Sequence, residues 1–427
     1  MSDFVKLKDL CATITDGSHY SPPASSKGYP MLSSKDMNDT DFDYSHCKYI
    51  DEKEFQKMKQ NGCVPLKDDV LIIKDGNNYL EKVFVVKETK EIAILSSIGI
   101  LRPNTEIVDP YYIKYYLTSR FVKEEVAKKY VTGSALPRII LKNFGDIDMP
   151  YVNLNTQHRI VRVLKEFDDA IDNNNIISSE LESLAKTIYD YWFLQFDFPD
   201  ENGRPYKSSG GKMVWNEELK REIPEGWKVD KAGNYISLIR GVAYKPSDEK
   251  NSAVKNIVPL LKSNNIQNGK INFDSPVYLL AEKISPEQFL KDHSVFITMS
   301  SGSKAHMGKT AILYKSLPYA FGAFCARISI NPKYRSFLSM YFVSDMFRKY
   351  IESVTSGTSI NNISSEQLAS IIIAFPPEKV LNKFEEILNP IFSKQGDIVM
   401  ENYQLSSLRD FLLPMLMNGQ VTFKEDA

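Results

Sequence analysis

One segment of the chain has the residue types of a phosphate-binding loop. It runs from Gly302 through Ser303 and Lys304 to Gly308-Lys309-Thr310. The phosphate-binding pattern places four residues between its two glycines, whereas five separate Gly302 from Gly308. The matching part of an internal repeat, Asp75 to Asn78, has no glycine-lysine pair. The segment is therefore predicted to be a turn between strands rather than an ATP site.

A second segment, Asp109-Pro110-Tyr111-Tyr112, is similar to the Asp-Pro-Pro-Tyr tetrad that catalyses methyl transfer to amino groups. The second proline of the tetrad is absent, and no Gly-x-Gly cofactor loop precedes the segment. At the same place in the repeat the chain has Asn331-Pro332. Proline is favoured in the first turn of a helix, so both segments are predicted to begin helices. Methyl transfer by this chain alone is not expected.

Neither the histidines nor the cysteines form a metal-binding pattern. The five histidines are scattered and none of the four cysteines lies in a C-x-x-C pair, so no metal site is predicted. The many carboxylates leave a nuclease pair open, but no spacing singles one out. The formal net charge of −1 means that nucleic-acid binding must come from local groups. Because the sequence shows no long apolar run and no apolar leader, a reduced, cytoplasmic protein is expected.

Small polar and basic residues recur in loops at corresponding places in the two halves of the chain. Such residues suit DNA, because Lys and Arg hold phosphates while hydroxyls and amides pair with base edges. We predict that at least one loop in each half reaches DNA. The candidates in the first half are Ser33, Lys35, Lys74, Asp75, Gly76, Ser134 and Arg138. The candidates in the second half are Lys262, Asn264, Ser300, Ser303, Lys304, Ser359, Asn361 and Asn362.

The two halves are related by a constant offset in residue number, which separates Gly17 from Gly241 and Gly133 from Gly357 alike. A period as long as half the chain indicates duplication of a whole domain rather than a solenoid. The predicted fold class is mixed α/β, with two tandem pseudo-repeated domains and two long helices that form an antiparallel intramolecular coiled coil. The predicted parts are a domain at 1–150, a helix at 151–196, a linker at 197–226, a domain at 227–375, a helix at 376–420 and a tail at 421–427. The predicted strands include Val70–Ile73, Val83–Val86 and Ile94–Arg102, and Val295–Thr298 repeats the first of them.

Each half ends in a long amphipathic segment. Apolar residues recur every seven positions and again three positions later, which is typical of a helix that packs on another helix. Asn155 is the predicted N-cap of the first helix, and Asn418-Gly419 is the predicted end of the second. In the first helix one column is Ile160, Phe167, Asn174, Leu181 and Ile188, and the other is Val163, Ala170, Ile177, Leu184 and Tyr191. In the second helix one column is Phe384, Ile391, Ile398, Leu405 and Leu412, and the other begins at Ile387 and ends at Leu408 and Met415.

Each helix can pair with the other helix of the same chain or with a copy from a second chain. The intramolecular pair is favoured, because tethering gives the partner helix a high effective concentration. An antiparallel pair would place Asn174 near Lys394 or Glu401, and these polar residues would help to fix the register. Pro390 lies well inside the second helix and is expected to kink or loosen it.

Three stretches carry the motifs of a known family. They are Gln157–Leu164 with Phe167–Asp172, Phe193–Trp227, and Leu405–Pro414 with Met417–Val421. No single motif is decisive, but the ordered set and the repeat together cover essentially the whole chain. The sequence thus resembles the specificity subunits of type I restriction-modification enzymes.

The resemblance implies that residues 1–150 and 227–375 are target-recognition domains, each reading one half of a split site in double-stranded DNA. It implies that the helices are a spacer and the docking surface for two methyltransferase subunits, with restriction (translocase) subunits joining the assembly. It assigns this chain no catalytic residue and no cofactor, because S-adenosylmethionine, ATP and Mg²⁺ would be held by partner subunits. No membrane partner is expected. Two other classes stay open: a self-contained DNA methyltransferase or nuclease, and a coiled-coil scaffold that binds no nucleic acid.

Overall fold

The chain forms two compact units, each of which is described by itself. Unit 1 consists of Met1–Asp172 with Gln404–Ala427, and unit 2 consists of Asn173–Tyr403. Each unit therefore contains part of both long helices, in contrast to the predicted division into domains and separate spacers. The computed structural model describes residues 3–38, 40–76, 79–132, 138–250, 254–267, 269–273, 276–302, 306–355, 362–421 and 423.

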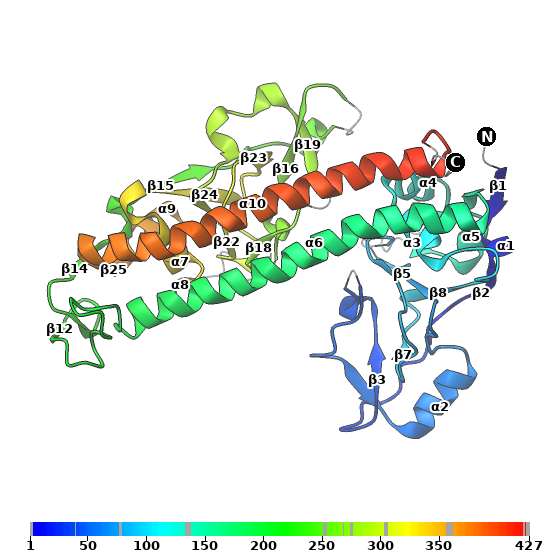
Figure 1. Cartoon of the computed structure of the whole chain (residues 1–427), viewed down its shortest axis with the longest axis horizontal. Coiled ribbons are helices and arrows are strands. Elements are labelled where there is room, and N and C mark those ends of the chain that lie inside the picture. The colour runs from blue at the N-terminus through cyan, green and yellow to red at the C-terminus, as the bar shows by residue number, and fades with distance from the viewer. Residues whose placement is uncertain are drawn as a thin grey trace. The chain divides into compact units, whose positions relative to one another are not determined.

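A four-stranded antiparallel sheet forms the centre of unit 1 (Figure 1). Its third strand coincides with the predicted strand Val70–Ile73 and is buried on both faces, because all four of its residues are apolar. Val70 and Ile72 pack in one cluster with the helices, and Leu71 and Ile73 pack in a second cluster on the other face. The strands in order are β2 (Cys11–Asp16), β8 (Ile98–Pro103), β5 (Val70–Ile73) and β6 (Val83–Val85).

A smaller sheet in unit 1 contains β4 (Lys48–Ile50), β3 (Tyr29–Leu32) and β7 (Ala93–Ile94), with β3 parallel to β7. The predicted strand Ile94–Arg102 is therefore wrong as one element, because a turn separates β7 from β8, which lies in the other sheet. That turn belongs to the candidate site described below.

The helix predicted to begin at Pro110 is divided into α3 (Pro110–Thr118) and α4 (Arg120–Lys129). Ser119 ends the first helix because its backbone is extended (φ −62°, ψ 141°), and its hydroxyl caps the second by accepting from the Val122 amide. The start itself agrees with the prediction: Asp109 accepts from the Tyr111 amide and Pro110 occupies the first turn.

Unit 2 repeats the central sheet of unit 1 strand for strand, and its second sheet has one strand more than that of unit 1. Its central sheet has the order β15 (Ile236–Arg240), β24 (Cys325–Ile330), β21 (Ser294–Thr298) and β22 (Thr310–Leu313), again antiparallel throughout. Its second sheet has the order β19 (Val277–Leu280), β16 (Ile257–Leu261), β23 (Leu317–Phe321) and β20 (Phe289–Leu290), with β16 parallel to β23. The duplication predicted from the constant offset between the halves is thus present in the fold.

Shorter elements complete both units. Unit 1 also contains β1 (Asp3–Lys6), α1 (Leu7–Leu10), η1 (Ser34–Asp36), α2 (Glu52–Gln60), β9 (Val131–Thr132), β10 (Arg138–Ile139), α5 (Leu141–Gly145) and β11 (Asp148–Tyr151). Unit 2 also contains β12 (Met213–Asn216), β13 (Arg221–Pro224), β14 (Lys228–Lys231), η3 (Ala232–Asn234), η4 (Pro246–Asp248), η5 (Ser263–Asn265), β17 (Ile266–Gln267), β18 (Lys270–Ile271), η6 (Ala281–Lys283), η7 (Pro286–Gln288), η9 (Pro332–Tyr334), α7 (Arg335–Phe342), α8 (Asp345–Thr355), α9 (Ser365–Ala369) and β25 (Ile372–Phe375).

The long helices are α6 (Leu154–Tyr189), which continues into the π-helical turn η2 (Asp190–Leu194), and α10 (Glu378–Met417). The predicted N-cap Asn155 is wrong, because the Asn153 side chain accepts from the Thr156 amide and Asn155 lies inside the helix. Pro390 does not interrupt α10, since it lies on an exposed face where water can solvate the carbonyl that loses its donor. The helix ends as predicted, with Gly419 at φ +68°.

Within each unit, α6 and α10 pack against each other in opposite directions (Figure 1). The first predicted columns lie in the seam: Ile160 and Leu412 belong to the apolar cluster of unit 1, and Leu181, Ile188 and Phe384 to that of unit 2. Other members of these columns are buried, namely Asn174, Ile391 and Ile398, whereas Phe167 and Leu405 are half-buried.

The second predicted columns are wrong in part. Ile177, Leu184, Tyr191, Ile387 and Leu408 are between 38% and 48% exposed, whereas Val163, Ala170 and Met415 are half-buried. The residues that complete the seam instead lie four positions after each member of the first column, one position later than predicted. One residue turns the helix by about 100°, and this turn brings the later position to the buried face. The buried or half-buried residues at these positions are Leu164, Ile171, Ser178, Ala185 and Trp192 in α6 and η2, and Leu388, Gln395, Asn402, Arg409 and Leu416 in α10.

Polar pairs fix the register of the seam. In unit 2 the Ser178 hydroxyl donates to Gln395 Oε1 (2.8 Å), and Gln395 Nε2 donates back to the Ser178 carbonyl (2.7 Å). The Asn174 amide donates to Asn402 Oδ1 (3.0 Å), so its partner is neither Lys394 nor Glu401 as predicted. Both of these charged residues precede a seam position by one residue and are exposed.

The seam in unit 1 contains an ion pair in place of an amide pair. Arg409 Nη1 donates to Asp168 Oδ1 (2.8 Å), and the Tyr115 hydroxyl and Lys114 contact the other carboxylate oxygen. Burial alone would raise the pKa of Asp168, but Lys114 and Arg409 hold this pKa below its ordinary value. The pair therefore stabilises unit 1 at neutral pH, and its contribution is lost as the pH falls through that lowered pKa.

The segment 197–226, predicted to be a linker, is folded onto unit 2. Phe196, Phe198, Ile223 and Trp227 are buried in the main apolar cluster of that unit. Between them, β12 and β13 form an antiparallel pair. Gly203, Gly210 and Gly226 adopt positive φ in its turns and bends. Pro199 pairs with Pro205 in an isolated bridge, and Pro224 lies in β13.

The register predicts unequal effects for two neighbouring residues of α10. Gln395→Ala removes both hydrogen bonds to Ser178 from a side chain that is 1% exposed, and should destabilise the protein by about 1–3 kcal/mol. Lys394→Ala, on an exposed side chain, should stay within about 0.5 kcal/mol of wild type. Urea unfolding followed by circular dichroism measures both values, and a larger loss for Lys394→Ala would contradict the register.

Candidate nucleic-acid interface

In unit 1 the chain makes a close crossing directly after β2. Gly17 lies against the turn between β7 and β8, where a Cβ atom would meet the Ile94 carbonyl oxygen at 2.2 Å and that of Leu95 at 2.5 Å. The Ser18 amide donates to the Ile94 carbonyl (2.8 Å), and the Ser96 amide donates to the Ser18 carbonyl (2.9 Å). Only glycine fits at position 17, because any side chain would overlap backbone atoms that cannot rotate away.

Unit 2 makes the same crossing after β15. A Cβ atom at Gly241 would meet the Gly322 carbonyl oxygen at 2.2 Å and the Phe321 carbonyl oxygen at 2.4 Å. The Val242 amide donates to the Phe321 carbonyl (2.7 Å), and the Ala323 amide donates to the Val242 carbonyl (2.9 Å). The repeated glycines in the sequence therefore mark a repeated backbone contact, which we call the glycine crossing.

The end of one central strand and the start of its neighbour reach the glycine crossing in each unit. In unit 1 the Lys74 amide donates to the Ser97 carbonyl (3.1 Å), and the Ile139 amide donates to the Lys74 carbonyl (2.9 Å). These bonds bring the predicted residues Lys74 to Gly76 next to the strand that follows the predicted loop 134–138.

The corresponding bonds in unit 2 run from the Met299 amide to the Phe324 carbonyl (2.8 Å) and from the Ile363 amide to the Met299 carbonyl (2.8 Å). Ser300, next in the chain, forms a bridge with Asn362. The matched bonds show that Lys74 corresponds to Met299 in the fold, and Ser97 to Phe324.

A third predicted loop lies at the crossing in each unit. In unit 1 the Ser34 amide donates to the Ser97 hydroxyl (3.1 Å), and Ser33 is held by Asp36 through both its amide and its hydroxyl. In unit 2 the Gly322 amide donates to the Leu261 carbonyl (2.9 Å), and the amide of the following residue, Lys262, donates to Asn265 Oδ1 (2.8 Å). The fold thus gathers loops that lie far apart in the sequence.

Charge is distributed differently at the two crossings. In unit 1 the Lys74 ammonium is buried and lies 3.3 Å from Asp16 Oδ2 and 3.4 Å from Asp75 Oδ1. His19 Nε2 lies 3.2 Å from the same oxygen of Asp16. In unit 2 the residue before the crossing glycine is Arg240, which is exposed. The two crossings therefore present different groups on the same backbone frame.

The remaining predicted DNA contacts have the following positions. Lys35 is exposed on η1, and Gly76 adopts φ +86° in a turn. Asn264 and Asn362 are exposed beside the crossing of unit 2. Ser134, Ser303, Lys304, Ser359 and Asn361 lie outside the described residues, and only the backbone of Arg138 is described. Contact of any of these residues with DNA stays a prediction.

Two groups of residues at the crossings were missed by sequence reasoning. Asp16 and His19 flank Gly17, so the repeated glycine was a signal that could have found them. Tyr20 and Phe324 are exposed aromatic residues, 58% and 66% exposed respectively. No local pattern distinguishes them from the many buried aromatic residues, because their exposure depends on how the turns fold.

The phosphate-loop-like segment connects two antiparallel strands, since Ile297 of β21 pairs with Thr310 of β22. A phosphate-binding loop would lead from a strand into a helix, so the prediction of a strand-connecting turn is confirmed for the described part of the segment. Among the described residues, no three His, Cys, Asp or Glu side chains converge as metal ligands, and none of the helices is long and apolar enough to span a bilayer.

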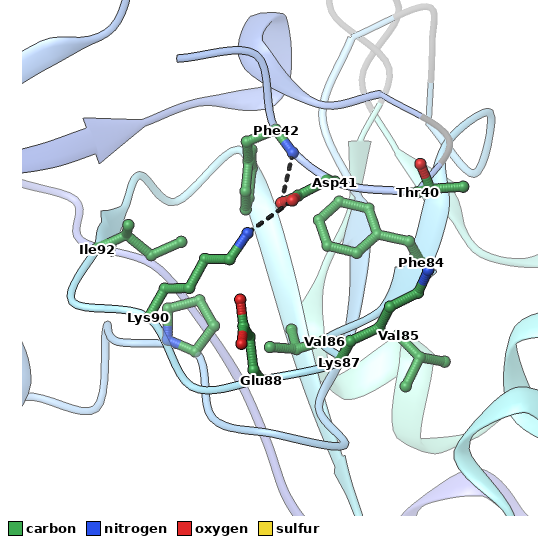
Figure 2. Close-up of a pocket in the computed structure, with 11 residues that line it drawn as sticks. Thr40, Asp41, Phe42, Phe84, Val85, Val86, Lys87, Glu88, Lys90 and Ile92 are labelled. Atoms are coloured by element: carbon green, nitrogen blue, oxygen red, sulfur yellow. Dashed lines mark hydrogen bonds and ion pairs between the residues drawn. The ribbon is translucent and has the colours of Figure 1, made fainter. Parts of the chain in front are cut away.

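A pocket in unit 1 is too small to be a ligand site. It encloses about 100 Å³ beside the ion pair between Lys90 and Asp41 (2.6 Å), with Phe42 and Phe84 in its wall (Figure 2). Typical small-molecule sites measure about 300–1,000 Å³. The glycine crossings therefore remain the better candidates for function.

Comparison with known proteins identifies the family to which this chain is similar. Residues 2–183 and 224–398 match the family described as "Type I restriction modification DNA specificity domain". The specificity subunit of the type I restriction enzyme MjaIX of Methanocaldococcus jannaschii is 24% identical over 329 residues, 76% of this chain and 71% of that protein. The EcoKI specificity subunit of Escherichia coli is 30% identical over 210 residues, 48% of this chain and 45% of that protein. The crystal structure of a type I S subunit from M. genitalium has a similar fold, with a TM-score of 0.50 and 15% identity over 99% of this chain and 97% of that one.

The glycine crossings predict a specific pattern of destabilisation. Gly17→Ala and Gly241→Ala should each destabilise the protein by about 1–3 kcal/mol, because the new methyl group overlaps backbone carbonyls. Gly302→Ala is the control, since a Cβ atom there meets nothing within 4 Å, and it should stay within about 0.5 kcal/mol of wild type. Thermal unfolding measures all three, and equal stability of the Gly17 and Gly302 variants would contradict the crossing.

Proposed function

Because the chain belongs to the family of type I restriction-modification DNA specificity domains, we propose that it is the DNA-recognition subunit of a type I restriction-modification enzyme. In this proposal each unit reads one half of a split site in double-stranded DNA. The observation that carries it is the glycine crossing, which occurs once in each unit with matching hydrogen bonds.

The crossings have properties that recognition requires. Their backbone is fixed by hydrogen bonds, so the side chains around it can be held in place with little loss of entropy on binding. The frame is the same in both units, whereas the groups on it differ: Asp16, Lys74 and Ser97 in unit 1 correspond to Arg240, Met299 and Phe324 in unit 2. One frame with two sets of side chains suits a protein that reads two different half-sites.

The exposed apolar residues of the helices support docking of two copies of one partner, which we propose to be the methyltransferase subunit. Leu184 in unit 2 is 48% exposed, and Leu408 in unit 1 is 46% exposed. They are separated by the same offset as Gly17 and Gly241, so they occupy equivalent places in the repeat. Because each unit presents the same leucine on its part of the helix pair, each can contact one copy of the same protein.

The chemistry is proposed to reside in the partners. S-adenosylmethionine would be held by the methyltransferase subunits, and ATP and Mg²⁺ by restriction subunits that complete the assembly. The proposed location is the cytoplasm, because the DNA that the assembly would modify or cut is found there.

Exchange of one recognition segment tests the proposed function. Replacing residues 1–150 by the equivalent segment of another family member should change one half of the methylated site and leave the other half unchanged, because each half is read by its own unit. The reciprocal replacement of residues 227–375 should change the other half. Methylation-site mapping in cells that contain the chain and its partners measures both outcomes. An unchanged site after both exchanges would refute the proposal.

Substitution of the repeated leucines tests the docking of partners. Leu184→Glu and Leu408→Glu should each remove one methyltransferase copy from the complex, and the double variant should remove both, because a carboxylate is costly to bury in an apolar contact. Native mass spectrometry counts the copies. Ser183→Glu and Ser407→Glu are matched controls, since both serines are exposed neighbours at the same repeat spacing. Full retention of both copies in the double leucine variant would refute the docking surface.

A further inference from the structure

One turn at the glycine crossing of unit 2 presents a phenyl ring to solvent. The turn Gly322–Cys325 is closed by the Cys325 amide, which donates to the Gly322 carbonyl (2.8 Å). The Phe324 carbonyl accepts from two amides, those of Met299 (2.8 Å) and Ser300 (3.1 Å). With the bonds from Gly322 to Leu261 and from Ala323 to Val242, every residue of the turn is tied to the rest of the fold.

Phe324 differs from its buried surroundings. Its side chain is 66% exposed, the largest exposed fraction among the large apolar side chains of the described residues. Phe321 and Cys325 nearby in the chain, and Met299, whose amide donates to the Phe324 carbonyl, are all 0% exposed. A single exposed apolar residue needs no explanation on a mobile loop, but here a rigid frame holds the ring outward beside polar loops.

The corresponding residue of unit 1 has the opposite role. Ser97 occupies the position of Phe324, because the Lys74 amide bonds its carbonyl as the Met299 amide bonds that of Phe324. Ser97 is half-buried, and its hydroxyl accepts from the Ser34 amide (3.1 Å). The same backbone position therefore carries a hydroxyl that is hydrogen-bonded within the protein in one unit and an exposed ring in the other.

We propose that Phe324 makes an apolar contact with DNA bases in the half-site read by unit 2, and that unit 1 has no such contact at the equivalent place. The inference rests on the proposed function, since it requires the crossing to face DNA. A phenyl ring has no hydrogen-bonding group, so its contribution comes from contact with a thymine methyl group or from insertion beside a base. The polar residues next to it, Ser300 and Asn362, are of the types that pair with base edges.

The proposal is tested with the full chain assembled with its methyltransferase subunits and a duplex carrying the site found by methylation mapping. Phe324→Ala should weaken binding about tenfold, as loss of one base contact does. The dependence of affinity on salt should be unchanged, because no charge is removed. In a panel of duplexes with single base-pair changes, preference should flatten at one or two adjacent positions of the unit 2 half-site only.

Matched variants separate a base contact from other effects. Phe4→Ala removes a phenyl ring that is 61% exposed on β1, a strand that contributes no residue to either crossing, and should leave affinity unchanged. Phe324→Leu keeps an apolar side chain and should retain most of the affinity. Uracil lacks the methyl group of thymine. Replacement of thymine by uracil in the half-site should therefore weaken wild-type binding as Phe324→Ala does if the ring contacts that methyl group. It should leave wild-type affinity unchanged if the ring inserts beside a base.

Two results would overturn the inference. Unchanged affinity and base preference in Phe324→Ala would show that the ring does not contact DNA, as would a loss of preference spread equally over both half-sites. Failure of the wild-type complex to bind its duplex would instead refute the proposed function. Equal thermal stability of Phe324→Ala and wild type checks that the exposed ring is not needed for folding.

Discussion

Both candidate interfaces depend on two backbone segments that pass each other without room for a side chain. At Gly17 and Gly241 a Cβ atom would lie 2.2 Å from a carbonyl oxygen, and no rotamer relieves such an overlap. The close passage brings amides and carbonyls of three other segments within hydrogen-bond distance. Loops that are far apart in the sequence thereby become neighbours with a fixed backbone. A duplicated protein keeps this frame in both copies while the side chains on it diverge, which is how one fold can read two half-sites.

The helix pair obeys a different constraint, the matching of polar groups along an apolar seam. A buried Gln395 is tolerated because Ser178 satisfies both ends of its amide. A shift of the helices by one turn would leave these groups unpaired, so the polar pairs specify the register more strictly than the apolar contacts do. The same arrangement leaves Leu184 and Leu408 exposed, and these leucines then become available to partners.

Much of the architecture could be predicted from the sequence, because it follows from local pattern. Four consecutive apolar residues indicated the buried strand at Val70, Asp109-Pro110 indicated a helix start, and the constant offset between equivalent glycines indicated the duplication. The errors arose where the local pattern was ambiguous. Ile177 and Ile387 were assigned to the seam because they are apolar, but they are exposed. Gln395 and Asn402 were not assigned to it because they are polar, but they are buried and half-buried. Apolar character alone does not show which face of a helix is covered. The site was predicted in part: the repeated loops were found, but Asp16 and Phe324 were not, since their roles depend on contacts between segments distant in sequence.

In the proposed function the glycine crossings face DNA. Hydroxyl-radical footprinting of the chain assembled with its methyltransferase subunits, with and without its duplex, tests this placement, because exposed aromatic rings react readily and protection reports burial by the ligand. Tyr20 and Phe324, at the two crossings, should lose reactivity when DNA binds, while Phe4 on β1 and Trp215 on β12 should keep theirs. Unchanged reactivity of both Tyr20 and Phe324 in the presence of bound DNA would show that the crossings do not face DNA.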